Sequence, residues 1–355
     1  MFGRDLYFEH WEKTMAVRLK ALNEQVMVIT GATSGIGLTT ARAAAKRGAR
    51  LVLAARNESS LNALCAEING QGGSAIYVAA DVGKEGDVMK IAAEALNKFD
   101  NFDTWVNNAG VSIYGKLEDV PTADSRRLFE TNFWGVVNGS LVAVRNLKIN
   151  GGALINIGST LSDRAIPIQG MYCASKHAVK GFTDALRMEL EAENAPVSVT
   201  LIKPSAIDTP YKDHAKNYLD AEPENPAPVY SPETVAETIL YCAENPTRDV
   251  FVGAGGKMLS LAGKYAPRMV DRVMENSMIS AQKTDRPAEP NGRTSLYESH
   301  DGSLSERGGY DGHVSESSIY TQASLHPAIT GVATGAILAL GAGLAYKFLK
   351  RDQIQ

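Results

Sequence analysis

Short apolar stretches rich in β-branched residues alternate along most of the chain with stretches of helical apolar spacing. The apolar stretches predict strands at 25–30, 51–55, 75–79, 103–107, 153–157, 197–202 and 249–252. Segments between them, such as 84–98 and 121–148, are predicted to be helices. Near-continuous apolar strands separated by helices are typical of a parallel sheet covered on both faces, because each crossover places a helix on one face. The pattern therefore predicts an α/β fold, a doubly wound parallel sheet that binds its ligand at the carboxyl ends of the strands.

Composition and charge exclude several other classes of protein. The 355 residues are 44% hydrophobic and 21% charged, which excludes a disordered, collagen-like or multi-spanning membrane protein. A net charge of −4 gives no reason to expect nucleic-acid binding. Cys65, Cys173 and Cys242 lie far apart, which excludes a disulfide scaffold. The histidines are scattered without ligand spacing, so we expect no metal site.

The regions on either side of the core pattern differ from it in composition. Residues 1–24 carry acidic side chains among their apolar positions, so we interpret them as an N-terminal extension and not as a signal peptide. Residues 25–280 are predicted to form one domain that ends in a single helix over 256–280. Residues 281–327 are dominated by Gly, Ser, Pro and charges, and we expect a polar linker because such a segment buries too little apolar surface to offset its ordering entropy.

Residues 328–346 contain no charged side chain, and a basic tail, 347–355, follows them. A helix of this length, with a rise of about 1.5 Å per residue, roughly spans a hydrocarbon core of about 30 Å. We therefore predict a transmembrane helix that tethers the domain to a membrane, with the domain on the cytoplasmic side. The basic tail conflicts with that orientation, since positive residues favour the cytoplasmic side. Because the segment is rich in Ala and Gly, the alternative is a soluble cytoplasmic protein whose last helix packs on its own domain or on a partner subunit.

A glycine-rich turn, TGATSGIG at 30–37, follows the first predicted strand and opens a helix. Glycines here permit a tight turn and let backbone N–H groups approach a pyrophosphate at the positive end of the helix. The motif by itself is only moderately specific, because ordinary strand–helix turns are also rich in glycine. The residues of this turn that we expect to contact a dinucleotide are Gly31, Thr33, Ser34, Gly35, Ile36 and Gly37.

The ends of the next strands carry residues that suit other parts of a dinucleotide. Arg56 stands where an acidic residue would accept hydrogen bonds from a ribose hydroxyl, and it could pair with a 2′-phosphate instead, which favours NADP(H) over NAD(H). A solvated surface arginine is the alternative. Asp81, with its neighbour Val82, suits the adenine amine, whereas its alternative is a helix cap. Asn108 lies in the sequence NNAG at the end of the fourth strand, which is otherwise a common turn composition.

A second constellation predicts proton-transfer chemistry. Tyr172 and Lys176 are four residues apart in a helical segment, so both project from one face. A nearby ammonium favours a phenolate, so we expect it to lower the pKa of Tyr172 from its usual value of about 10. Ser159 ends the fifth strand, where it could hydrogen-bond a substrate oxygen. Asn132 lies in an apolar helical run, where a buried amide needs partners and could simply bond neighbouring backbone.

These motifs, in this order, resemble those of the short-chain dehydrogenase/reductase family. The resemblance covers residues 25 to about 253 and implies a single Rossmann-like domain. It implies that Tyr172 is the catalytic acid/base, that Lys176 lowers its pKa and holds the nicotinamide ribose, and that Ser159 orients the substrate. Asn132 would hold a water that links Lys176 to a proton relay.

The same resemblance places the hydroxyl of Thr209 near the nicotinamide carboxamide. The chain departs from the family pattern at Ser205, where the family usually has Gly. Substrate choice is expected to lie in 210–230, a segment that can lie across the pocket as a lid or form a solvated loop. Its candidate lining residues are Tyr211, Tyr218, Leu219 and Tyr230.

The resulting hypothesis is an NADP(H)-dependent oxidoreductase that interconverts a carbonyl and a secondary alcohol. The substrate is a small molecule, and an apolar one would agree with a membrane tether. The resemblance also implies a homo-oligomer, formed through the helices at 121–148 and 171–193, although the apolar run 133–137 could equally be core. The alternative is a non-catalytic nucleotide-sensing or scaffolding protein with the same fold.

Overall fold

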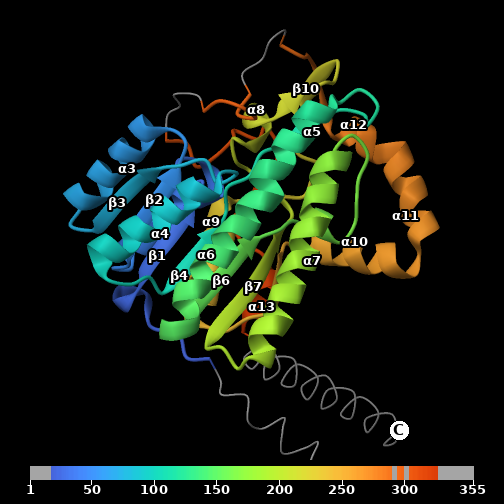
Figure 1. Ribbon diagram of the computed structural model, residues 1–355. Helices are drawn as coiled ribbons and strands as arrows, with labels where there is room; N and C mark the ends of the chain where they lie inside the picture. Colours follow the sequence, from blue (N-terminus) through green and yellow to red (C-terminus); the bar gives the residue numbers. More distant parts are fainter. Residues whose placement is uncertain (1–16, 290–293, 300–303, 327–355) are drawn as a thin grey trace, which may run out of the picture.

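Seven parallel strands form the central sheet of the computed structural model, which describes residues 17–289, 294–299 and 304–326 (Figure 1). Their order across the sheet is β12-β7-β6-β4-β1-β2-β3. The strands are β1 (Val26–Thr30), β2 (Arg50–Ala55), β3 (Ser74–Ala79), β4 (Thr104–Asn107), β6 (Gly152–Ile157), β7 (Val197–Pro204) and β12 (Asp249–Val252). The chain adds β2 and β3 on one side of β1 and then returns to add the other strands on its opposite side. This order confirms the predicted doubly wound sheet.

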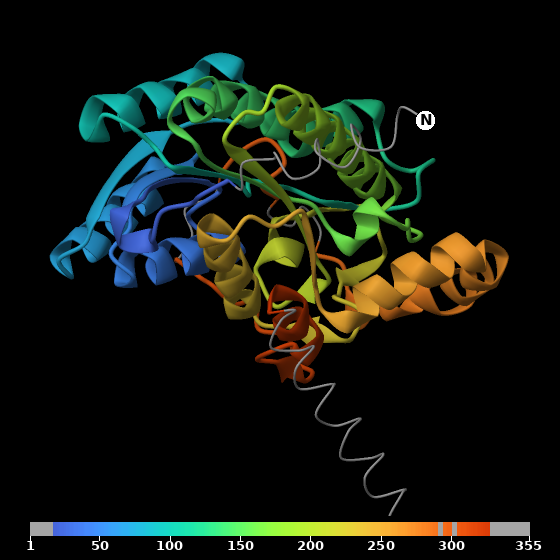
Figure 2. The same cartoon turned by 90° about the horizontal axis from the view of Figure 1, so that it is seen from below.

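Helices cover both faces of the sheet, as Figure 2 shows from below. One layer consists of α4 (Glu85–Phe99), α5 (Thr122–Phe129), α6 (Gly135–Asn150) and α7 (Gly170–Ala192). The other consists of α2 (Gly35–Lys46), α3 (Glu58–Gly70), α9 (Pro232–Glu244) and α13 (Ile319–Leu325). On β1, Val28 packs in the core under the first layer and Ile29 in the core under the second, and both are fully buried. Successive side chains of a strand point to opposite faces of the sheet. Because helices cover both faces here, the strands need apolar residues along their whole length.

Short elements build the region beyond the carboxyl ends of the central strands. Two of them, α8 and β10, lie at the top of Figure 1, above the sheet. The short elements of this region are β5 (Ile113–Tyr114), η3 (Thr160–Ser162), β8 (Ala206–Ile207), α8 (Tyr211–His214), β9 (Lys216–Asn217), β10 (Ala221–Pro223) and β11 (Val229–Tyr230). A further short turn, η1 (Leu22–Glu24), precedes β1.

The helix predicted over 121–148 is interrupted by a π-helical turn. Its parts are α5, the turn η2 (Glu130–Trp134), and α6. Such wide turns often occur at functional sites, and this one contains Asn132, which is fully buried. In the apolar run that follows, Val136 and Val137 are buried whereas Trp134 is 47% exposed. The run is therefore divided between core and surface, and oligomerisation through it stays a prediction.

The prediction of one helix over 256–280 is wrong. The segment forms α10 (Ala254–Tyr265), α11 (Pro267–Val273), the π-helical turn η4 (Met274–Met278) and α12 (Ile279–Ala281). Pro267 lacks the N–H that would continue the first helix, and its ring clashes with the preceding turn, so the chain bends before it. Val270 and Met274 pack back against the domain beside Ile166 and Cys173.

The segment predicted to be a polar linker, 281–327, contributes strands, a helix and buried side chains to the domain in its described part. It adds β13 (Lys283–Pro287), which pairs with β10, then β14 (Val314–Ser315), which pairs with β11, and finally α13. Leu296 is fully buried and Leu325 is 4% exposed. The linker interpretation fails here because a few well-placed apolar side chains and many backbone hydrogen bonds offset the ordering entropy, and composition does not reveal where those groups lie.

The predicted transmembrane helix, 328–346, and the basic tail, 347–355, lie outside the described residues, as do residues 1–16. Within 17–289, 294–299 and 304–326, no helix has both the length and the apolar character needed to cross a membrane.

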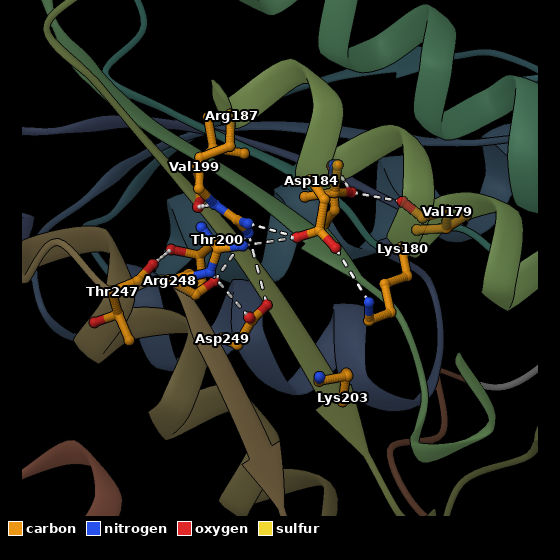
Figure 3. Close-up of polar contacts among 12 residues, drawn as sticks. Val179, Lys180, Asp184, Arg187, Val199, Thr200, Lys203, Thr247, Arg248 and Asp249 are labelled. Carbon is orange, nitrogen blue, oxygen red and sulfur yellow. Dashed lines mark hydrogen bonds and ion pairs between the residues drawn. The ribbon is translucent and has the colours of Figure 1, made fainter. Parts of the chain in front are cut away.

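A network of charged side chains fixes the second half of α7 to the sheet (Figure 3). The buried Arg187 donates to the carbonyl oxygen of Val199 in β7 at 2.9 Å, to that of Arg248 at 3.2 Å and to Asp184 Oδ1 at 2.7 Å. Burial alone would raise the pKa of Asp184, but hydrogen bonds from Lys180 and Arg187 outweigh it and hold this pKa below its usual range. The stability linked to this depressed pKa is therefore present at neutral pH and is lost as the pH falls below about 4.

We expect Arg187→Ala to lower the free energy of unfolding by about 3 kcal/mol, because the change removes a buried guanidinium and leaves its partners unsatisfied. Urea unfolding at neutral pH measures the change. Arg126→Ala, at an exposed arginine of α5, is the matched control and should stay within about 0.5 kcal/mol of the parent. Equal unfolding midpoints for the two variants would show that the network contributes nothing to stability.

Candidate active site

A cavity of about 520 Å³ lies at the carboxyl ends of the central strands. Its volume is in the range of small-molecule and cofactor sites. The structure brings most of the predicted site residues to its wall, namely Gly31, Thr33, Ser34, Gly35, Ile36, Arg56, Asp81, Val82, Asn108, Ser159, Tyr172, Lys176 and Thr209. Two predicted residues, Gly37 and Asn132, lie behind the wall and do not line it.

The glycine-rich turn has the close packing that a phosphate-binding turn needs. Gly31 and Gly35 have positive φ angles of 65° and 50°. A Cβ at Gly37 would lie 2.1 Å from the carbonyl oxygen of Gly31, so the turn and the first helical turn touch directly. Asn108 Nδ2 donates to the carbonyl oxygens of Thr30 and Gly31 at 2.9 and 3.2 Å. Asn108 therefore ties the end of β4 to the turn after β1.

Cationic groups gather where the ribose of the adenosine half is expected. The guanidinium of Arg56 donates to the carbonyl oxygens of Ser295 and Tyr297. Burial lowers the pKa of Arg56, and the nearby charge of Arg127 lowers it further. Asp81 accepts a hydrogen bond from Arg127 at 2.7 Å. Sequence reasoning missed Arg127, since a lone arginine on a helix carries no signal of what it will face.

Tyr172 and Lys176 project into the cavity from the first half of α7. Lys176 Nζ lies 5.7 Å from the centre of the Tyr172 ring and donates to the carbonyl oxygen of Ile157, in β6, at 2.8 Å. Burial raises the pKa of Tyr172 to about 12, although the hydroxyls of Tyr211 and Ser159 lower it in part. Burial also lowers the pKa of Lys176 to about 8.

The expected lowering of the Tyr172 pKa is therefore wrong for the structure as described. Helical spacing does place the two groups on one face. The free-energy cost of burying a charged phenolate, however, exceeds the stabilisation that the neighbouring groups give it. The ammonium of Lys176 bonds a strand carbonyl and not the phenol. A protonated phenol at neutral pH is the form that donates a proton.

Asn132 is bonded entirely to protein groups near the cavity. Its Nδ2 donates to the carbonyl oxygen of Val111 at 2.9 Å and to Ser175 Oγ at 3.2 Å, and its Oδ1 accepts from the Val111 N–H at 2.8 Å. These bonds match the simple expectation for a buried amide and connect η2 to α7. The role of Asn132 in a proton relay stays a prediction.

Ser205, the departure from the family pattern, lines the cavity with two glycines packed against it. A Cβ at Gly253 would lie 3.0 Å from Ser205 Oγ, and a Cβ at Gly256 would lie 2.9 Å from the same atom. Gly253 has a φ of 101°, which favours glycine. The extra side chain at Ser205 is thus accommodated by glycines from the turn after β12 and from α10.

The segment 210–230 contributes one of its four candidate residues to the cavity. Tyr211 lines the cavity, and its ring meets the ring of Tyr172 edge to face, with 5.6 Å between the ring centres. The buried hydroxyl of Tyr211 faces those of Tyr172 and Ser112 without completing a hydrogen bond of good geometry. Tyr218 instead donates to Asp124 at 2.5 Å. Neither Tyr218, Leu219 nor Tyr230 lines the cavity.

Apolar side chains form the cavity wall beyond Tyr172. Leu259, Met274 and Met278 come from α10 and η4, and Ile166 and Pro228 come from loops. Sequence reasoning missed Leu259, Met274 and Met278, because they lie far along the chain from every motif and their apolar spacing is that of any packed helix.

No three metal-ligating side chains lie close enough together in the described part of the chain to hold an ion. Cys65, Cys173 and Cys242 are free and buried.

The fold is a doubly wound α/β sheet, and at its crossover point a glycine-rich turn lines the same cavity as the Ser159, Tyr172 and Lys176 side chains. The chain belongs to the short-chain dehydrogenase/reductase family, whose "short chain dehydrogenase" model matches residues 25–219. This family is one of oxidoreductases. The fold and the motifs agree with the resemblance seen in the sequence.

Three relatives illustrate the extent of the similarity. The uncharacterized oxidoreductase YxnA of Bacillus subtilis (strain 168) is 47% identical over 329 residues, 92% of each chain, so the shared region continues past the family model. The dehydrogenase/reductase SDR family member 7B of Bos taurus is 32% identical over 283 residues, 76% of this chain and 86% of the relative. An alcohol dehydrogenase from the archaeon Thermococcus sibiricus, complexed with 5-hydroxy-NADP, has a TM-score of 0.57 and 27% identity, over 64% of this chain and 95% of that chain.

Proposed function

We propose that the protein is an NADP(H)-dependent oxidoreductase that interconverts a carbonyl group and a secondary alcohol, with Tyr172 as the acid/base. The observation that carries this proposal is the convergence of Ser159, Tyr172 and Lys176 in one cavity with the glycine-rich turn. A sensing protein would need only the nucleotide half of that cavity.

The residues at the nucleotide end fit a phosphorylated dinucleotide. The close approach of Gly37 to Gly31 makes a turn without side-chain bulk at the start of α2, where the helix dipole favours an anion. Arg56 supplies a positive charge near the adenosine ribose, and the wall there has no acidic residue at the end of β2. The bound 5-hydroxy-NADP of the Thermococcus sibiricus relative agrees with this choice.

Two hydroxyls are placed to bind the substrate oxygen. A nicotinamide bound in this cavity would supply or accept the hydride. Ser159 Oγ and the Tyr172 hydroxyl would both donate hydrogen bonds to the carbonyl oxygen as negative charge develops on it. With a pKa of about 12, Tyr172 is protonated at neutral pH and transfers its proton from Oη to that oxygen. Lys176, anchored to Ile157, places a positive charge beside the phenolate that remains.

The substrate proposed for this cavity is apolar apart from its carbonyl or hydroxyl group. Leu259, Met274 and Met278 offer a flexible apolar wall, and methionine side chains adapt to irregular shapes. A screen of ketones, aldehydes and secondary alcohols of increasing apolar size identifies the substrate.

The location of the protein is part of the same proposal. The length of the uncharged stretch is the observation behind a membrane tether through 328–346, and a soluble protein is the alternative. Fractionation of cells that express the full chain distinguishes the two, since only a tethered protein needs detergent for release.

Tyr172→Phe should lower kcat for carbonyl reduction by about 100-fold or more, because the change removes the proton donor, while NADPH still binds with unchanged affinity. Steady-state rates and calorimetric titration with NADPH measure the two effects. The control is Tyr265→Phe at an exposed tyrosine of α10, which should behave as the parent. A Tyr172→Phe variant with the parental rate would disprove the acid/base role. A parent that binds NADPH but turns over no compound in the screen would favour the sensing alternative.

Tyr211→Phe should shift the pH dependence of alcohol oxidation to higher pH. Oxidation needs the phenolate of Tyr172, and the Tyr211 hydroxyl lowers the pKa of that group, so its removal raises this pKa further. The ascending limb of kcat/KM should move up by less than about one pH unit, because the Tyr211 hydroxyl does not complete a hydrogen bond of good geometry and even a full one contributes only about 1 kcal/mol. Carbonyl reduction at neutral pH should change little, because Tyr172 stays protonated. An unshifted limb would exclude this interaction.

Arg56→Gln should weaken NADPH binding by about tenfold or more and leave NADH binding within about twofold, because a charge-assisted hydrogen bond to the 2′-phosphate contributes about 1.5–3 kcal/mol. Dissociation constants from calorimetry test this without a known substrate. Arg145→Gln, at an exposed arginine of α6, is the control. Equal loss of affinity for both nucleotides would argue against a 2′-phosphate site.

A further inference from the structure

Part of the C-terminal segment lies over the nucleotide end of the cavity. We call residues 294–299 and 304–310 the C-terminal strap. Its backbone carbonyl groups accept hydrogen bonds from both arginines there: Arg56 donates to Ser295 and to Tyr297, the latter at 3.1 Å, and Arg127 Nε donates to Leu296 at 3.0 Å. Ser295 also lines the cavity. The strap is therefore part of the wall that would face a bound nucleotide.

The second half of the strap reaches the phosphate-binding turn and the loop after β7. The N–H of Gly35, at the start of α2, donates to the carbonyl oxygen of Ser305 at 2.9 Å. Asp208 Oδ1 accepts from the N–H groups of Gly308 and Tyr310 at 3.1 and 3.0 Å. A Cβ at Gly308 would lie 2.2 Å from the carbonyl oxygen of Thr209, so this contact requires glycine. The strap thus follows the cavity from the expected ribose to the expected nicotinamide.

Two side-chain contacts beside the cavity anchor the strap. Leu296 is fully buried in a small cluster with Val111, Ile113 and Leu128. The hydroxyl of Tyr297 donates to Asp124 Oδ1 at 2.7 Å. These anchors fix the carbonyl groups that receive Arg56, so the direction of its guanidinium depends on the strap.

The charged side chains at the nucleotide end of the cavity carry a net positive charge, which favours the binding of a phosphate group. Arg127 is paired with Asp81, whereas Arg56, in the part of the chain that the structure describes, bonds neutral carbonyl oxygens and forms no ion pair. The positive charge of Arg127 lies close enough to lower the pKa of Arg56. Two neighbouring guanidinium groups with one carboxylate leave a net positive charge, which a phosphate dianion would neutralise.

We propose that the C-terminal strap closes the adenosine end of the dinucleotide site and orients Arg56 toward the 2′-phosphate, so that the preference for NADP(H) depends on the strap as well as on the arginine. The proposal rests on the NADP(H) site proposed above. It assigns to 294–299 and 304–310 a positioning role, since their carbonyl groups hold the arginine and not the phosphate.

Leu296→Ala tests this by loosening the anchor of the strap at a residue that does not itself line the cavity, although its neighbour Val111 does. The dissociation constant of NADPH, from calorimetry, should rise about tenfold, whereas that of NADH should stay within about twofold. The matched control is Leu325→Ala, because Leu325 is also buried in the same C-terminal segment but packs in the core under α9. It should lower the melting temperature as Leu296→Ala does and leave both dissociation constants unchanged.

Tyr297→Phe is a second, milder variant that removes one hydroxyl contact and creates no cavity, so it stays informative if Leu296→Ala does not fold. It should weaken NADPH binding about two- to threefold, again with little effect on NADH. If the parent prefers NADPH and the folded variants keep its ratio of affinities, the strap proposal is wrong while the proposed function stands. If the parent shows no preference for NADPH, the NADP(H) proposal itself is wrong.

Discussion

Two buried cationic side chains hold helix α7 against the sheet, and the arrangement of the site depends on them. Lys176 bonds the carbonyl oxygen of Ile157 in β6, and Arg187 bonds that of Val199 in β7. Both bonds are charge-assisted and lie in surroundings from which water is largely excluded, so they are stronger than their counterparts in water. Because Tyr172 lies on the same helix, these anchors also set its distance from Ser159. The helix therefore holds Tyr172 and Lys176 in fixed positions at the cavity.

Burial gives the two halves of the cavity different electrostatic properties. Around Tyr172, desolvation dominates and keeps the phenol protonated, which suits proton donation to a carbonyl oxygen. Around Arg56, the side chain is too basic to lose its charge, so burial leaves a cation that needs an anion. The cavity thus combines a neutral acid at one end with a net positive charge at the other, which is what the proposed binding of NADP(H) and of a neutral carbonyl compound would require.

The C-terminal segment shows how much a sparse set of apolar residues can do. Leu296 and Leu325 are separated by polar, glycine-rich sequence, and each fills a place in a core formed by earlier parts of the chain. Between them, backbone groups of the strap bond Gly35 and Asp208. Average composition treats such a segment as solvent-exposed, because it counts apolar residues without regard to where each one packs.

The sequence by itself determined the order of the central strands, the doubly wound topology and the motif residues of the cavity wall, because those depend on local periodicity and on motifs at strand ends. It also placed Tyr172 and Lys176 on one helix face, since the helical repeat alone requires this. Only the tertiary structure decided the break at Pro267, the packing of 281–326, the contact of Arg127 with Asp81 and the direction of the Tyr172 pKa. Each of these depends on which distant groups surround a residue, and burial and long-range contacts leave no periodic trace in the sequence.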